Sequence, residues 1–185
     1  MLNTRRLLLL LLPLAACAVN PVTDNEFMLA DGDVVRGAAD GVRTAAFSAQ
    51  RAFGDTSLWH DNPIAACFGT AQLEYLHRNF TTNPRFATTA SFDTIHSMRE
   101  GQRALRQAAN IPASADSRRL ENDLRIAVRE LSSGNRAAAE AALAAYGPNL
   151  IGRLTSLPRI REVEAASGAA VVEFGSSRGG NQGRL

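Results

Sequence analysis

Apolar residues recur at steps of three and four along most of this chain, and that spacing constrains the fold more than any other feature of the sequence. The pattern is clearest in residues 115–133. If this segment is helical, its apolar side chains lie within an arc of about 100° around the helix. These residues are Leu120, Leu124, Ala127, Val128 and Leu131. Arg118, Arg125 and Arg129 fall on the opposite side. The pattern predicts an amphipathic helix with one face in a core.

Capping and helix-breaking residues divide the chain into further helices. Pro63 suits the first turn of a helix, and Asp61 or Asn62 can cap it. Trp59 precedes that cap and can fold back on the first turn as a hydrophobic staple. Gly134 can end one helix and Asn135 can cap the next. We therefore expect helices over residues 33–53, from Pro63 onward, and over 91–109, 115–133 and 136–146.

Beyond Pro148 the pattern is weaker. It indicates two short helices, over residues 150–157 and 159–166, and Val171 to Phe174 read as a strand or an extended packing segment. Residues 175–185 are rich in Gly and Ser and predict a disordered tail. Large aliphatic residues are few, so we expect a core padded with alanine. The predicted fold is all-α: a small bundle of about five to six helices over residues 33–174.

The first 17 residues have the order of an export signal. Arg5 and Arg6 make the start cationic, residues 7–12 are six leucines, and small residues precede Cys17. Charge, then an apolar run, then small residues is the pattern of a secretory signal peptide. The apolar run is too short for a spanning helix, which needs about 18 residues. We expect residues 1–16 to be removed.

The segment Leu14-Ala15-Ala16-Cys17 resembles the lipobox of bacterial lipoproteins. The resemblance implies that Cys17 becomes the first mature residue and carries acyl chains such as palmitate, and several chains together anchor a protein durably. Residues 17–32 would then be the lipidated cysteine and a flexible tether. Ala18, where this class has Asp for retention at the inner membrane, implies the periplasmic side of the outer membrane.

Charge and motifs exclude several classes of function. The chain has a net charge of +2, and it contains no lysine. Arg5 and Arg6 lie in the predicted signal peptide, so the remainder is neutral, which argues against a nucleic-acid partner. No nucleotide-binding or nucleophile motif is present in the sequence, and this favours a role other than catalysis, without a cofactor.

The potential metal-binding and catalytic side chains form no recognisable set. His60, His77 and His96 lie on separate elements and lack the spacing of metal ligands. Glu121 with Asp123, and Glu162 with Glu164, are two residues apart and point to different helix faces, so neither pair is an acid/base dyad. Once Cys17 is lipidated only Cys67 remains, in an apolar run, and we expect it to be buried.

The most unusual pattern lies on the helix over residues 91–109. Arg99, Arg103 and Arg106 share an arc of about 60°, and His96 lies one turn earlier on the same side. Like charges at this spacing repel, and arginine suits phosphates and carboxylates, so these four residues are a candidate anion-binding or partner-binding site. Alternatively, the arginines pair with Glu100 or with acids on other helices, or they face water.

These observations predict a membrane-anchored lipoprotein whose helical domain is a structural or protein-interaction module with a protein or cell-envelope partner. The alternative is an extracytoplasmic binder of a small apolar or anionic ligand. A pocket lined by Phe68, Tyr75 or Met98 would favour the ligand binder, and a broad exposed apolar patch would favour a protein partner.

Overall fold

A computed structural model describes residues 41–176 of the chain. The predicted signal peptide, Cys17, the tether, residues 33–40 of the first helix and residues 177–185 of the tail lie outside this range. No helix in the described range combines the length and the apolar character needed to cross a bilayer.

The described residues are helical and contain no strand, which confirms the all-α class. In chain order the elements are α1 (Gly41–Phe53), the 3-10 helix η2 (Thr56–Trp59), α2 (Pro63–Thr82), α3 (Pro84–Ala87), α4 (Phe92–Ala108), α5 (Ser117–Ser132), α6 (Arg136–Ala142), the 3-10 helix η3 (Ala144–Tyr146), α7 (Leu150–Thr155) and α8 (Arg161–Ser176).

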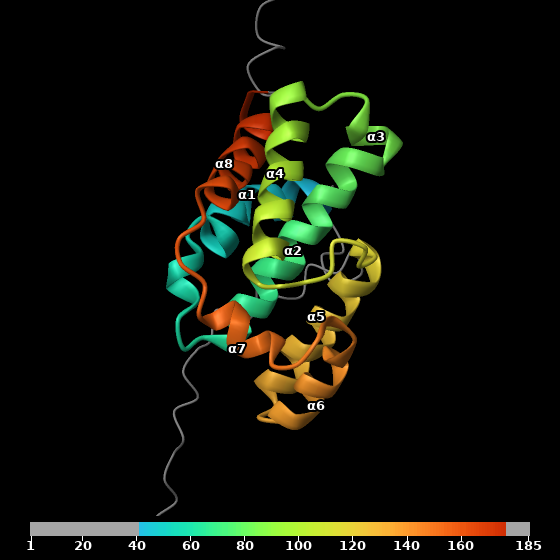
Figure 1. Ribbon diagram of the computed structural model, residues 1–185. Helices are drawn as coiled ribbons and strands as arrows, with labels where there is room; N and C mark the ends of the chain where they lie inside the picture. The colour runs from blue at the N-terminus through green and yellow to red at the C-terminus, as the bar shows by residue number, and fades with distance from the viewer. Residues whose placement is uncertain (1–40, 177–185) are drawn as a thin grey trace, which may run out of the picture.

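The long helix α2 organises the domain (Figure 1). It packs against α1 and α4, and α8 packs against these two helices in turn, so that the four form one bundle. Helices α5 and α7 also pack against α2, and α6 packs against α5. One core joins the two parts, and about a third of its buried apolar residues are alanines, as the composition predicts.

The predicted caps at Asn62 and Asn135 are confirmed, and Ser91 and Asp116 cap two further helices. The side chains of Asn62, Ser91, Asp116 and Asn135 each accept a hydrogen bond from the backbone N–H three residues on, at 2.8–3.2 Å. Gly134 has φ +79°, a left-handed conformation that ends α5 and lets α6 fold back against it.

Two glycines set how closely the helices approach. A Cβ at Gly69 of α2 would lie 2.4 Å from the Ala52 carbonyl oxygen of α1 and equally close to the Trp59 ring. A Cβ at Gly101 of α4 would lie 2.7 Å from the Cβ of Ala166 of α8. The Trp59 ring therefore packs against the second turn of α2, and its indole N–H donates to the Ala52 carbonyl oxygen at 3.2 Å.

The C-terminal part differs from the sequence prediction. Val171 to Phe174 are helical, and α8 continues through Gly175 and Ser176, which we had expected in the tail. The strand or extended-segment prediction was wrong because β-branched residues fit a helix whose inner face packs on α1 and α4. Phe174 contacts the rings of Phe47, Phe80 and Phe86, with centroids 6.0–6.4 Å apart.

Two smaller differences concern helix boundaries. The short helix α3 was not predicted; Asn83 caps it by accepting a hydrogen bond from the Arg85 N–H. The predicted helix over residues 136–146 is divided at Leu143 into α6 and η3.

Candidate functional site

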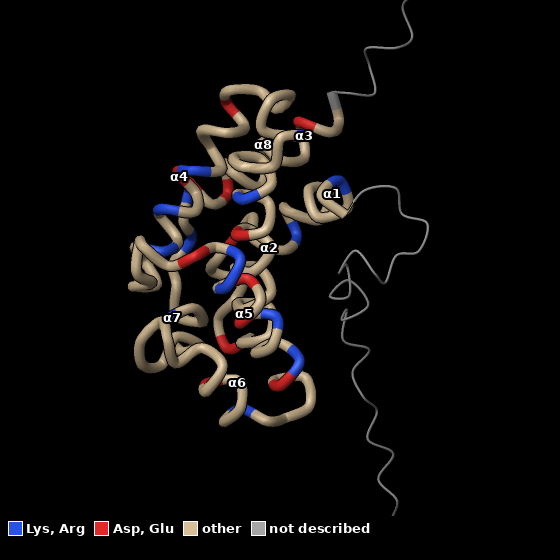
Figure 2. Tube along the Cα trace, turned by 90° about the vertical axis from the view of Figure 1, so that its right-hand side faces the viewer, with Lys and Arg blue, Asp and Glu red and all other residues tan. Residues whose placement is uncertain are grey.

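The basic residues of α4 lie along one side of the helix, as the spacing predicts (Figure 2). Their environments nevertheless differ. Arg99 and Arg103 are exposed, whereas Arg106 is only 7% exposed. The three arginines are therefore not one exposed stripe, and each has to be considered by itself.

Arg106 forms a buried ion pair with Glu74 of α2. Its Nε and Nη2 atoms donate to the two Glu74 carboxylate oxygens at 2.7 and 2.8 Å, and the Glu74 side chain is completely buried. The remaining nitrogen, Nη1, donates to the carbonyl oxygens of Ala113 and Ala115 at 3.2 and 2.8 Å. Arg106 thereby joins α2 and α4 to the loop before α5.

Gln102 and Ser117 complete this network. The Gln102 amide donates to Glu74 at 2.7 Å and to the Ser117 hydroxyl oxygen at 2.9 Å, and Arg106 Nη2 donates to the same hydroxyl oxygen at 3.0 Å. A buried carboxylate needs such a set of donors to offset its lost hydration. Arg106 therefore pairs with an acid on a neighbouring helix, which was one of the alternatives considered from the sequence.

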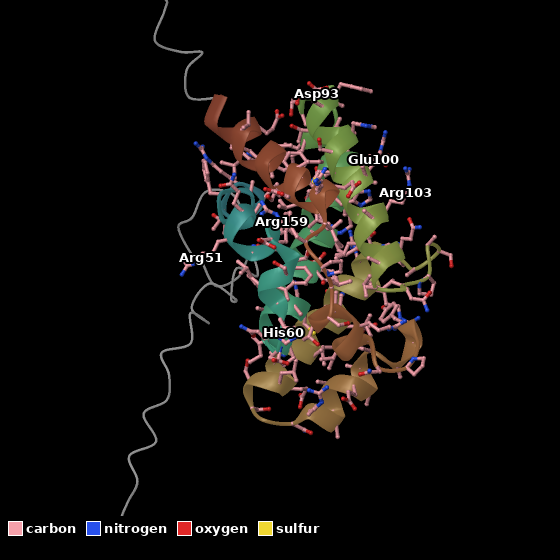
Figure 3. All side chains as sticks on the ribbon, turned by 60° about the vertical axis from the view of Figure 1, so that its left-hand side comes forward. Arg51, His60, Asp93, Glu100, Arg103 and Arg159 are labelled. Atoms are coloured by element: carbon pink, nitrogen blue, oxygen red, sulfur yellow. The ribbon has the colours of Figure 1, made fainter. Side chains whose placement is uncertain are left out.

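Arg103 pairs with Glu100 one turn earlier on the outer side of α4 (Figure 3), with both oxygens of Glu100 within 2.8 Å of Nη1. Both side chains are at least a third exposed, so this pair contributes little to stability. Arg99 makes no hydrogen bond or ion pair with any residue that the structure describes.

His96 is not part of the network around the arginines. Its ring stacks on that of Phe92, with centroids 6.0 Å apart and planes within 4°. Both residues are exposed at the start of α4.

A cavity of about 550 Å³, which we name the α4 hollow, opens beside the arginines. Helix α4 contributes Arg99, Gln102, Arg103, Arg106 and Gln107 to its lining. The other lining residues are His77 of α2 and, from the loop after α4, Ile111 and Ala113. The hollow has the size of a small-ligand site. His96 does not line it, nor do Phe68, Tyr75 or Met98.

His77 also lines the hollow; the sequence suggested it only as a potential metal ligand, and its place beside the arginines was not predicted. Burial lowers the pKa of His77 to about 4, and the charges of Arg106 and Arg99 act in the same direction, against Glu74. The ring is therefore neutral near pH 7. Its Nδ1 atom is buried without a hydrogen-bond partner. A signal in the sequence that could have indicated this placement is the three-residue step from Glu74 to His77. That step puts both side chains on the face of α2 that meets α4.

The other residues considered for chemistry have separate structural environments. Cys67 is completely buried, and burial raises the pKa of its thiol to about 12. Glu121 accepts from Arg78 and Arg125, while Asp123 accepts from the Tyr146 hydroxyl, so the two acids face different partners. Among residues 41–176 no three His, Cys, Asp or Glu side chains lie together as metal ligands.

Glu164 pairs with Arg159 at the start of α8, on the exposed side of that helix. Glu162 shares no partner with Glu164, and the Glu162 backbone carbonyl lies against α4 at Gly101.

No known family matches this sequence, and comparison with curated proteins and with solved structures also found no match.

Proposed function

We propose that this chain is a bacterial lipoprotein, anchored in the outer membrane by acyl chains on Cys17, whose helical domain is a structural or protein-interaction module on the periplasmic side. The observation that carries the proposal is the order of the N-terminal segments: Arg5-Arg6, six leucines, and Leu14-Ala15-Ala16-Cys17. The chain between Cys17 and Gly41 spans at most about 86 Å when fully extended, so the domain stays within that distance of the membrane surface.

A partner would bind where α4 begins and α8 ends. Glu173 accepts hydrogen bonds from Ser91 and Thr94, so these helix ends are adjacent. Phe92 and Val172 are the chain neighbours of Ser91 and Glu173, and they are 78% and 66% exposed, among the most exposed large apolar side chains of the described residues. Aromatic residues such as Phe are enriched in protein interfaces, and neighbouring exposed apolar side chains can mark an interaction site.

The anchor is tested by metabolic labelling with palmitate and by membrane fractionation. Cys17→Ser should remove the label and release the protein from the membrane fraction. Cys67→Ala is the matched control, since it removes the other cysteine and should keep both the label and the membrane location. A Cys17→Ser protein that remains in the membrane, or that still incorporates palmitate, contradicts the proposal.

Sorting and the partner surface need separate experiments. Ala18→Asp should shift the protein from the outer to the inner membrane on a density gradient. A photo-crosslinker at position 92 or 172 should yield one defined adduct in intact cells, and the same group at Arg118, exposed on α5, should not. Equal crosslinking at all three positions would refute this surface.

A further inference from the structure

The charges around the α4 hollow do not balance. Arg106 is neutralised by Glu74, and Arg103 by Glu100. The guanidinium of Arg99 is left with no ion-pair partner among the described residues, and it lines the hollow. The cavity wall therefore carries one uncompensated positive charge.

Unpaired hydrogen-bonding groups accompany that charge. The His77 ring makes no hydrogen bond with the described residues, and its buried nitrogen is Nδ1. A neutral imidazole carries its proton on one nitrogen only. Leaving a bare lone pair on the buried Nδ1 costs less than burying an N–H there, so the proton belongs on Nε2. The Gln107 amide is exposed at the same wall.

We propose that the α4 hollow binds a small organic carboxylate, which Arg99 and the Nε2–H of His77 contact through its oxygens while Ile111 and Ala113 contact its apolar part. One negative charge matches the single uncompensated guanidinium, whereas a phosphate ester near pH 7 carries about −1.5 to −2. Arginine donates two parallel hydrogen bonds to a carboxylate, which a lysine cannot do. This site is independent of the lipid anchor and of the surface around Phe92.

The test uses the purified full chain in detergent with benzoate as the probe. We expect saturable binding by calorimetry, and movement of the His77 ring signals in the NMR spectrum while those of His60 and His96 stay in place. Inorganic phosphate should bind at least about tenfold more weakly, which is a difference of about 1.4 kcal/mol.

Variants locate the site. Arg99→Ala should weaken benzoate binding at least about tenfold, because a charge-assisted hydrogen-bonded contact is lost. Arg129→Ala is the matched control, since Arg129 is also exposed on a helix without an ion-pair partner among the described residues, and binding should change less than about twofold. His77→Phe should weaken binding by removing the Nε2–H donor, and Arg99→Lys should fall between Arg99→Ala and the parent protein.

Three results would overturn the proposal. The first is no saturable shift of His77 up to about 20 mM benzoate, a concentration that would reveal even millimolar affinity. The second is equal weakening by Arg99→Ala and Arg129→Ala, which would indicate unspecific attraction to positive charge. The third is phosphate binding more tightly than benzoate. Circular dichroism of each variant shows that the fold is retained, and Arg99→Lys provides the comparison should Arg99→Ala be unfolded.

Discussion

Removing Arg106 should destabilise the domain far more than removing its neighbour Arg103. Arg106→Ala takes away two of the three side-chain donors to the buried Glu74 carboxylate and leaves only the Gln102 amide. It also frees the carbonyl oxygens of Ala113 and Ala115. The folded state would then contain a buried charge without its counter-ion.

The magnitude follows from burial. Breaking a buried ion pair on one side costs about 3–5 kcal/mol, out of a total stability of about 5–15 kcal/mol for a typical domain. For a domain of this size the loss corresponds to a decrease in Tm of roughly 10–20 °C. Arg103→Ala removes an exposed pair with Glu100 and should cost less than about 1 kcal/mol.

Urea unfolding followed by circular dichroism gives the free energy of unfolding of each variant, with Arg103→Ala as the control three residues away on the same helix. A third variant tests the cause. Replacing both partners, Glu74→Leu with Arg106→Met, removes the uncompensated charge and should recover most of the loss, since apolar pairs often substitute well for buried ion pairs. A cost below about 1 kcal/mol for Arg106→Ala, or no recovery in the double variant, would refute the argument.

Three further predictions concern single sites. Gly101→Ala should destabilise the protein by about 1–3 kcal/mol because its Cβ would meet Ala166, whereas Gly168→Ala on α8, with nothing within 4 Å, should stabilise it by up to about 1 kcal/mol; thermal unfolding compares the two. His77 is neutral in the folded state down to about pH 4 but takes up a proton at its ordinary pKa of 6.5 when unfolded. The unfolded chain therefore binds more protons between these pH values, and stability should fall by about 3 kcal/mol as the pH drops from 6.5 to 4; His77→Phe should lose this part of the decline and should otherwise unfold as the parent does. Cys67 should react with a thiol reagent only as fast as the protein unfolds, and rapid labelling under native conditions would contradict its burial.

Local signals in the sequence predicted the helices well. At Asn62 and Asn135 the predicted cap is a contact with the backbone three residues away, so neighbouring residues in the sequence were enough to predict it. The same local reasoning failed at residues 171–174. There, β-branched and aromatic residues suggested extended chain, but Phe174 is helical and packs on α1, α2 and α3, and these contacts cannot be inferred from neighbours in the sequence.

The candidate site was predicted only in part, for the same reason. Helical spacing correctly placed Arg99, Arg103 and Arg106 on one side of α4, but spacing does not tell an exposed guanidinium from a buried one. What distinguishes them is which helix lies opposite. Helix α2 brings Glu74 against Arg106 and, one turn later, His77 to the wall beside Arg99, so a single helix contact neutralises one arginine and completes a cavity around another. The feature that defines the α4 hollow, one unpaired charge beside a neutral imidazole, therefore belongs to the contact between α2 and α4 and is absent from either helix alone.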